Sequence, residues 1–184
     1  LKVPQDCLIL TMKANQKYFP LFDKANHLTN HFIIVSNLTP QDSIKIIQGN
    51  EKVIRPRLAD AEFFFEQDKQ KSLKSMSKKL NSIVYHNKLG TQSERASRVA
   101  VILKYITEEL KFKKTINFEE FALISKADLL SHMVGEFPEL QGVMGAIYAS
   151  EDKQFKNISS AIEDHYKPKF SGDTLPRDSF GAYA

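Results

Sequence analysis

The sequence contains a single cysteine and no long apolar run. Because Cys7 is the only cysteine among 184 residues, neither an internal disulfide nor a zinc site built from several cysteines can form. This cysteine usage fits a reducing cytoplasm. The longest apolar runs, residues 32–35 and 99–103, fall far below the ~20 residues that a transmembrane helix needs. We therefore expect a cytoplasmic globular chain with no membrane partner.

Signatures of targeting and of several enzyme classes are also missing. The first six residues include no initiator methionine and no basic segment followed by an apolar one, so we expect an internal piece of a longer protein. No GxxxxGK[ST], GxGxxG, GxSxG, HExxH or CxxC motif occurs. Their absence excludes the usual phosphate-binding loop, the nucleophile elbow and the common zinc sites.

One metal-dependent class has to be tested separately, the phosphohydrolases named for a His-Asp pair. Their chemistry needs an adjacent His-Asp dipeptide among the ligands that converge on a metal. None of the five histidines precedes an aspartate, and the nearest approach is Ala127-Asp128, whose alanine cannot ligate a metal. We expect no catalytic residue and no metal site here, and we expect Asp128 to form hydrogen bonds within the helical core.

Basic charge is concentrated in the first half of the chain. The formal net charge is +4, and residues 1–90 hold 14 Lys and Arg against 8 Asp and Glu. Between Asp68 and Glu94 there is no acidic residue, whereas six lysines fall in that window. Such a segment can meet a polyanion such as nucleic acid. The alternative is an ordinary solvated helix face, since lysine is a common surface residue.

Short apolar runs predict strands near the N-terminus. The runs cover residues 7–12, 16–22 and 31–36, and the turn-forming residues 23–26 predict a hairpin between the last two. Thr39 and Pro40 are typical of a helix start and Gly49 of a helix end, so a short helix should follow.

From residue 55 onward, apolar residues recur with the 3.6-residue period of helices. After a helix that begins at Pro56, we expect helices over about 73–84, 92–110, 117–134, 138–148 and 159–165, and then an irregular tail. Residues 91–94 form a capping box, and Asn117 repeats that capping pattern. The expected fold class is mainly α, a helical bundle over 55–184 with a small, partial mixed α/β region over 1–54.

Details of two predicted helices can be tested directly. In the third, Val99, Ile102, Leu103, Ile106 and Leu110 should point inward. In the fifth, glycines at 142 and 145 lie three residues apart. Because glycine costs about 1 kcal/mol inside a helix, this pair suggests close approach of another backbone.

Three lysines are candidate contacts for phosphate. Lys71, Lys74 and Lys78 recur at helical spacing, on the side opposite an apolar stripe. We therefore expect them on one exposed helix face, where they could bind the phosphates of a nucleic acid. The apolar stripe consists of Leu73, Met76, Leu80, Ile83 and Val84.

Two arginines form a second candidate phosphate site. Pro56 disfavours helical backbone at Arg55, so Arg55 and Arg57 should flank a helix N-terminus. Arginine forks suit phosphates. The alternative is an ion pair with Asp60 or Glu62.

Six segments resemble one family, in the right order and over nearly the whole chain. The most specific is KADL at 126–129 followed by GEFPELQG at 135–142. The segments cover residues 11–23, 30–37, 55–68, 86–95, 125–145 and 161–176. Together they resemble the beta subunit of the bacterial heterotetrameric glycyl-tRNA synthetase.

The resemblance implies a fold and a role. It implies an internal piece of the beta subunit, in which part of an N-terminal α/β region leads into a helical domain related to the His-Asp (HD) fold that has lost hydrolase chemistry. Glycine, ATP and Mg²⁺ would be handled by the alpha subunit, so these residues would hold no cofactor. The implied role is noncatalytic tRNA binding and assembly in a glycine–tRNA ligase. The implied partners are tRNA(Gly), the alpha subunit and the remaining beta-subunit domains. A residual HD-type phosphohydrolase and a pure inter-domain scaffold stay as alternatives.

Overall fold

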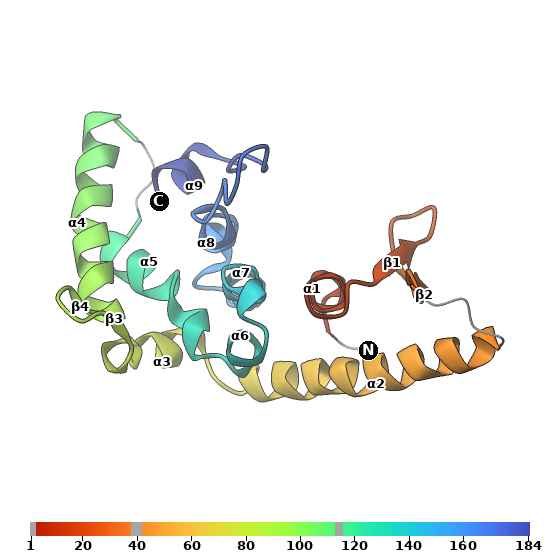
Figure 1. The fold of residues 1–184 in the computed structure, drawn as a ribbon. Helices are drawn as coiled ribbons and strands as arrows, with labels where there is room; N and C mark the ends of the chain where they lie inside the picture. Colours follow the sequence, from red (N-terminus) through yellow and green to blue (C-terminus); the bar gives the residue numbers. More distant parts are fainter. Residues whose placement is uncertain (1–2, 38–41, 113–115) are drawn as a thin grey trace. The chain divides into compact units, whose positions relative to one another are not determined.

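A computed structural model describes residues 3–37, 42–112 and 116–184, and it is mostly helical (Figure 1). The chain divides into two compact units, Leu1–Asp68 and Lys69–Ala184. The expected boundary between residues 54 and 55 falls inside a helix of the first unit. Within the described residues, no helix combines the length and the apolar character needed to cross a bilayer.

The first unit consists of two helices and a hairpin. Its elements are α1 (Gln5–Gln16), β1 (Phe19–Phe22), β2 (Leu28–Ile33) and α2 (Ser43–Asp68). The strand expected over residues 7–12 is wrong, because this segment lies in α1. Its buried residues are Cys7, Leu8, Thr11 and Met12, whose spacing of three to four residues is helical.

The predicted hairpin is confirmed. Strand β1 pairs antiparallel with β2, and Phe19 lies opposite Ile33. The turn is closed by Asp23, whose Oδ1 accepts hydrogen bonds from the backbone N–H groups of Ala25 (2.9 Å) and His27 (2.8 Å). Asn26 adopts a positive φ of 62°, which asparagine tolerates in turns.

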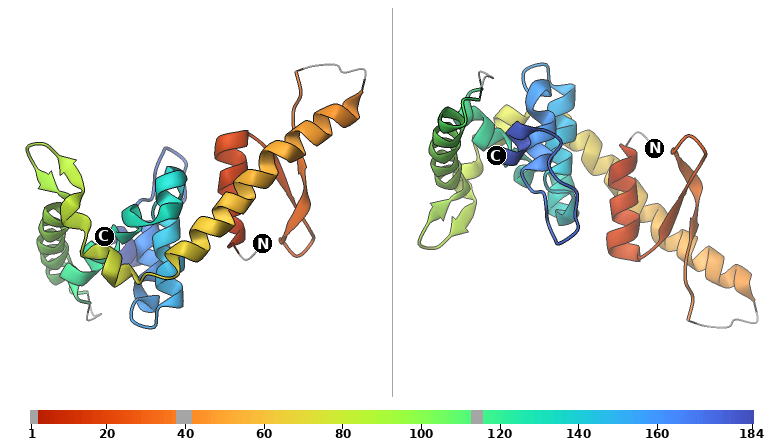
Figure 2. Two further views of the ribbon diagram at one scale, coloured as in Figure 1. Left: turned by 90° about the horizontal axis from the view of Figure 1, so that it is seen from below. Right: turned by 90° about the horizontal axis from the view of Figure 1, so that it is seen from above.

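Helix α2 is continuous, whereas we expected one helix to end at Gly49 and another to start at Pro56. Both residues are exposed, so water can satisfy the carbonyl that the missing N–H of Pro56 leaves unpaired. Packing on the other side stabilises the helix: Figure 2 shows α1 and the hairpin beside it, and Ile54 joins a cluster with Met12 and Tyr18. The start predicted at Thr39 and Pro40 lies outside the described residues.

The second unit is built from short helices around one long one. Helix α4 packs against α5, and α7 packs against α8. The elements, with η for 3-10 helices, are α3 (Leu73–Ser77), η1 (Leu80–Ser82), β3 (Val84–His86), β4 (Gly90–Thr91), α4 (Gln92–Glu109), α5 (Phe118–Ile124), η2 (Ala127–Leu130), α6 (His132–Glu136), η3 (Pro138–Leu140), α7 (Val143–Glu151), η4 (Lys156–Ile158), α8 (Ser159–Asp164) and α9 (Ser179–Tyr183).

The single helix expected over residues 73–84 is wrong, because α3 ends at Ser77 and strand β3 begins at Val84. The hydroxyls of Ser75, Ser77 and Ser82 each donate a hydrogen bond to the backbone carbonyl three residues earlier. Such local bonds compete with a regular helical ladder. The β-branched and aromatic residues of β3 then pair with β4 instead of extending the helix.

Helix α4 begins as predicted but buries a different face. The capping box is confirmed, with Thr91 accepting from the N–H of Glu94 and the Glu94 carboxylate accepting from the N–H of Thr91. Ile102 and Leu110, expected inside, are 58% and 56% exposed. The small side chains of Ala96 and Ala100 let α5 approach α4 closely, so the alanine face of α4 is buried instead of the face that carries Ile102. The buried residues are Ala96, Ala100, Leu103 and Thr107.

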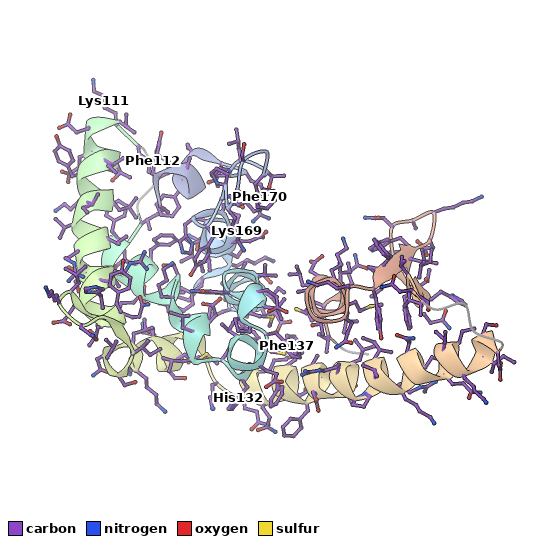
Figure 3. All side chains as sticks on the ribbon, viewed as in Figure 1. Lys111, Phe112, His132, Phe137, Lys169 and Phe170 are labelled. Carbon is purple, nitrogen blue, oxygen red and sulfur yellow. The ribbon has the colours of Figure 1, made fainter. Side chains whose placement is uncertain are left out.

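The remaining helices are shorter than expected. The helix predicted over 117–134 is broken into α5, η2 and α6, although the Asn117 cap is confirmed by its 3.0 Å bond from the N–H of Glu120. The helix predicted from Pro138 breaks at Gly142, which has a φ of +84°. The helix over 159–165 is confirmed as α8. The tail ends in α9, where the ring of Phe180 stacks on Phe112, which is labelled in Figure 3.

Candidate functional site

Two of the family-like segments, residues 125–145 and 161–176, meet in one largely buried group of polar residues. They come from η2 and the residue before it, from the turn between η3 and α7, and from the end of α8 and the residues that follow it. We call this group the motif cluster. Its members are Lys126, Asp128, Gln141, Gly142, His165 and Tyr166.

Lys126 lies at the centre of the motif cluster and is only 9% exposed. Its Nζ donates a 2.7 Å hydrogen bond to the Tyr166 hydroxyl and lies 2.6 Å from Nε2 of His165. The same Nζ lies 3.9 Å from the centroid of the Tyr166 ring, a cation–π distance. Burial, reinforced by the charge of Arg95, lowers the pKa of Lys126 to about 7.

The two aromatic partners of Lys126 are neutral. Burial, followed by the nearby charge of Lys126, lowers the pKa of His165 to about 3, so its Nε2 can accept from the ammonium group. Burial raises the pKa of Tyr166 above its usual value. The Tyr166 hydroxyl also accepts a 2.7 Å hydrogen bond from Nε2 of Gln141. One hydroxyl thus links the KADL segment to the GEFPELQG segment.

Asp128 forms hydrogen bonds within the helical core, as expected. Its fully buried Oδ2 accepts from the backbone N–H groups of Gly142 (2.6 Å) and Gly145 (3.1 Å). Burial raises the pKa of Asp128, and these two amide bonds act in the opposite direction. The arrangement fixes the start of α7 and occupies Oδ2 with backbone groups, whereas Oδ1 is buried without a hydrogen-bond partner among the described residues.

Gly142 and Gly145 lie at the start of α7, and close packing requires a glycine at both positions. A Cβ at Gly142 would meet the Tyr166 ring at 2.5 Å, and one at Gly145 would meet Cγ2 of Ile162 at 2.9 Å. Close packing at the two glycines is confirmed, but the expected approach of another backbone is wrong, because the nearest atoms belong to side chains. The apolar spacing in these segments predicts a core, and no sequence pattern indicates the polar contacts of Lys126 and Gln141.

The polar groups of the motif cluster mainly bond to one another. In the parts of the chain that the structure describes, no group of three or more His, Cys, Asp or Glu side chains is arranged to hold a metal. A buried, mutually bonded cluster of this kind orients the segments that carry it. The cluster therefore has a structural role, that of a clamp that holds η2, α7 and α8 together.

The candidate lysines lie on the surface around α3. Lys71, Lys74 and Lys78 are all exposed, as expected, while Leu73 and Met76 are buried beneath them. Only Lys74 lies within the helix, because Lys71 precedes the N-cap Ser72 and Lys78 is the C-cap. Leu80 is also buried, whereas Val84, expected on the same apolar stripe, is exposed.

The contacts of these lysines are weak ones at the surface. Nζ of Lys74 lies 3.0 Å from Oε1 of Glu120, which also accepts from Gln154. Nζ of Lys71 lies 3.5 Å from Nε2 of His132, a residue labelled in Figure 3. Exposed ion pairs contribute about 0–1 kcal/mol, so a phosphate can replace Glu120 as the partner of Lys74 at little cost.

A further lysine joins this surface from a distant part of the sequence. A depression of about 510 Å³ lies between the start of α3 and the end of α7, and both Lys71 and Lys153 line it. No sequence signal connects residues 71 and 153, because only folding brings them together. We call the combined group the lysine surface; it consists of Lys69, Lys71, Lys74, Lys78 and Lys153. Glu151 and Asp152 also line the depression.

The helix N-terminus predicted beside Arg55 and Arg57 is wrong, whereas phosphate binding by these two arginines stays a prediction. Arg55 and Arg57 lie inside α2, because Pro56 does not start a helix there. Arg55 pairs with Glu51 (3.7 Å), one turn earlier, rather than with either of the acidic residues expected. Both arginines belong to the first unit, whereas the lysine surface belongs to the second.

Comparisons with known proteins agree with the resemblance that the family-like segments indicate. The family model described as "Glycyl-tRNA synthetase beta subunit" matches residues 1–184. Among curated relatives, the glycine–tRNA ligase beta subunits of Dechloromonas aromatica, Thiobacillus denitrificans and Polaromonas naphthalenivorans are 59%, 57% and 57% identical to this chain over 182 residues. Each alignment covers 98% of this chain and 26% of the relative. The chain thus spans about a quarter of the length of the relatives that it matches, and it belongs to the glycyl-tRNA synthetase beta subunit family.

Proposed function

We propose that this chain is a noncatalytic part of a glycine–tRNA ligase and that its lysine surface contacts the phosphate backbone of tRNA(Gly). The observation that carries the proposal is the arrangement around α3. Lys71, Lys74 and Lys78 are exposed over a buried apolar side, and Lys153 joins them from the end of α7. Lysines placed in this way suit phosphate contacts that read shape and charge rather than base sequence.

The rest of the proposed activity lies outside these residues. Glycine, ATP and Mg²⁺ would be bound by the alpha subunit, in the cytoplasm, and the present residues would support assembly with that subunit and with the remaining beta-subunit domains. The names of the relatives support a role in ligating glycine to tRNA. The second unit would be an HD-like domain in which Ala127-Asp128 has become part of a structural clamp.

The two alternatives make different demands on the structure. A residual phosphohydrolase would need Asp128 as a metal ligand, yet Oδ2 of Asp128 accepts from two backbone amides. A pure scaffold would leave the lysine surface in contact with water alone. The first alternative predicts phosphate release that follows bound metal, and the second predicts no effect of lysine substitutions on tRNA affinity.

The experiment measures tRNA binding by the assembled alpha–beta enzyme over a range of salt concentrations. In a variant that combines Lys71→Ala, Lys74→Ala and Lys78→Ala, tRNA affinity should fall. The slope of log affinity against log salt should become shallower by up to about 1 for each lost phosphate contact. Thermal stability should stay close to that of the wild type, because the three side chains are exposed.

A matched control separates this surface from a general effect of charge. Lys24, Lys45 and Lys52 are exposed lysines of the first unit, so their replacement by alanine removes the same charge elsewhere. The control should retain the salt slope of the wild type. Equal slopes for the wild type and the Lys71/Lys74/Lys78 variant would exclude the proposed contact.

A further inference from the structure

The hairpin of the first unit carries apolar side chains on both faces. Its inner face includes Phe32 and Ile34, which pack against the cluster around Ile54, and Phe32 stacks on Tyr18 with ring centroids 4.8 Å apart. The alternate residues point the other way. We call them the outer face; they are Phe19, Leu21, Ile33 and Val35, with exposed fractions of 55%, 37%, 51% and 77%.

A sheet with one face in water normally alternates apolar and polar residues. This hairpin does not, because residues 18–22 and 32–35 are two unbroken apolar runs. Runs of this kind are typical of strands that are buried on both faces. Phe19 and Ile33 are directly paired across the strands, so these two exposed side chains lie side by side on the outer face.

The outer strand edges of the hairpin are open as well. In the described part of the chain, β1 and β2 pair only with each other. A two-stranded sheet is marginally stable in water, and packing on the Ile54 cluster stabilises this one only through its inner face.

We propose that the outer face is covered by an apolar segment of the same polypeptide that lies outside residues 1–184. Such a segment is available, because this chain corresponds to only 26% of the length of its relatives. A second copy of the chain fits less well. Stable association between separate chains usually buries about 1,600 Å², which is more than four side chains on a small hairpin can supply. A covalently connected segment avoids the loss of translational freedom that association requires.

Photo-crosslinking in the full-length polypeptide, assembled with its alpha subunit, tests the identity of the covering segment. Ile33 is replaced by p-benzoylphenylalanine, and the cross-linked peptides are identified by mass spectrometry. The expected product joins position 33 to a peptide of the same chain, outside residues 1–184. A product between two beta chains, a product with the alpha subunit, or a yield no higher than that of the control would overturn the proposal. The control places p-benzoylphenylalanine at Lys24, in the exposed turn of the hairpin.

Hydroxyl-radical footprinting of the unsubstituted assembly tests the cover without a mutation. Oxidation of Phe19 and Ile33 should be lost relative to the same polypeptide unfolded in urea, and dilution of the assembly should leave that protection unchanged. Oxidation close to that of the unfolded chain would show an open face. Protection that disappears on dilution would indicate a second chain, and either result would overturn the proposal.

Discussion

The carboxylate of Asp128 caps the helix that starts at Gly142, although the two residues are 14 positions apart in the sequence. Gly142 is the N-cap of α7 and has no side chain that could bond to the first turn. Asp128 supplies the missing acceptor for the N–H groups of Gly142 and Gly145. A cap provided from a distance joins two parts of the fold, in addition to satisfying the helix end.

The first prediction concerns Gly142. The substitution Gly142→Ala forces a side chain onto a backbone with φ of +84° and places its Cβ 2.5 Å from the Tyr166 ring. The second unit should lose about 2 kcal/mol or more of its free energy of unfolding. Native-state hydrogen exchange of the α7 amides at increasing urea concentration measures this loss.

Gly135 provides the matched control within the same unit. It lies in α6, and a Cβ at this position would meet nothing within 4 Å. Gly135→Ala should therefore be neutral or should stabilise the unit by up to about 1 kcal/mol. Equal effects of the two substitutions would contradict the role assigned to Gly142.

The second prediction is a pH dependence that arises from Lys126. The pKa of its ammonium group falls from 10.5 in the unfolded chain to about 7 in the folded one. Between these values the unfolded chain binds more protons, so stability should rise with pH. Between pH 7 and pH 9, the free energy of unfolding of the wild type should rise by up to about 2 kcal/mol relative to Lys126→Met.

Urea denaturation of both proteins at pH 7 and pH 9 measures this difference. In that window His165 is neutral when folded and mostly neutral when unfolded, since its pKa is about 3 in the folded chain and 6.5 in the unfolded one. Tyr166 keeps its proton because burial raises its pKa above 10. A difference between the two proteins that does not change with pH would show that Lys126 titrates normally.

The third prediction concerns the attachment of the C-terminal segment. Oδ2 of Asp164 accepts from the backbone N–H (2.9 Å) and Nε (2.8 Å) of Arg177, and Oδ1 accepts from Lys167. In Asp164→Asn, the charge-assisted bonds weaken and the buried amide of residue 164 cannot accept at both positions. Residues 170–184 should then exchange amide hydrogens faster than in the wild type, as mass spectrometry would show.

Acid provides a second test of the same contact. Burial raises the pKa of Asp164, but the hydrogen bonds from Arg177 and Lys167 outweigh burial and hold the pKa at about 2. The stabilisation from this lowered pKa is complete above the unfolded value of 3.8 and is lost as the pH falls from 3.8 towards 2. Release of the segment at pH 5 would contradict the assignment.

The fourth prediction concerns the thiol of Cys7. Burial, with a smaller effect from the charge of Asp6, raises its pKa to about 12. Because the thiolate is the reactive form, iodoacetamide should label Cys7 in urea and leave it unlabelled in the native protein at pH 8. Rapid native labelling would show that α1 is not packed as described.

Local signals in the sequence predicted part of this fold correctly. The hairpin turn at residues 23–26, the capping box at Thr91 and Glu94, and the cap at Asn117 all depend on side chains within a few positions of the bonds they make. Helix lengths were predicted less well, because tertiary packing carries α2 through Gly49 and Pro56. The inward face of α4 was misjudged since close packing there favours alanine over the larger Ile102.

The motif cluster could not be predicted from the sequence, for a related reason. The family-like segments could be recognised, but a lysine flanked by Ser125 and Ala127 shows no sign of burial in its own surroundings. Its partners His165 and Tyr166 lie about 40 positions away and meet it only after α7 and α8 have packed together. The placement of Lys153 beside Lys71 has the same origin.

Tyr166 takes part in two kinds of contact at once. Its hydroxyl accepts from Lys126 and Gln141, and its ring leaves no space for a side chain at Gly142. Evolution cannot change these positions independently. A family member with a larger residue at position 142 should carry a smaller one at position 166, and losing the hydroxyl would leave the ammonium of Lys126 with one acceptor fewer beside His165. Positions 126, 142 and 166 should therefore covary across the family, in a pattern set by space and hydrogen bonding.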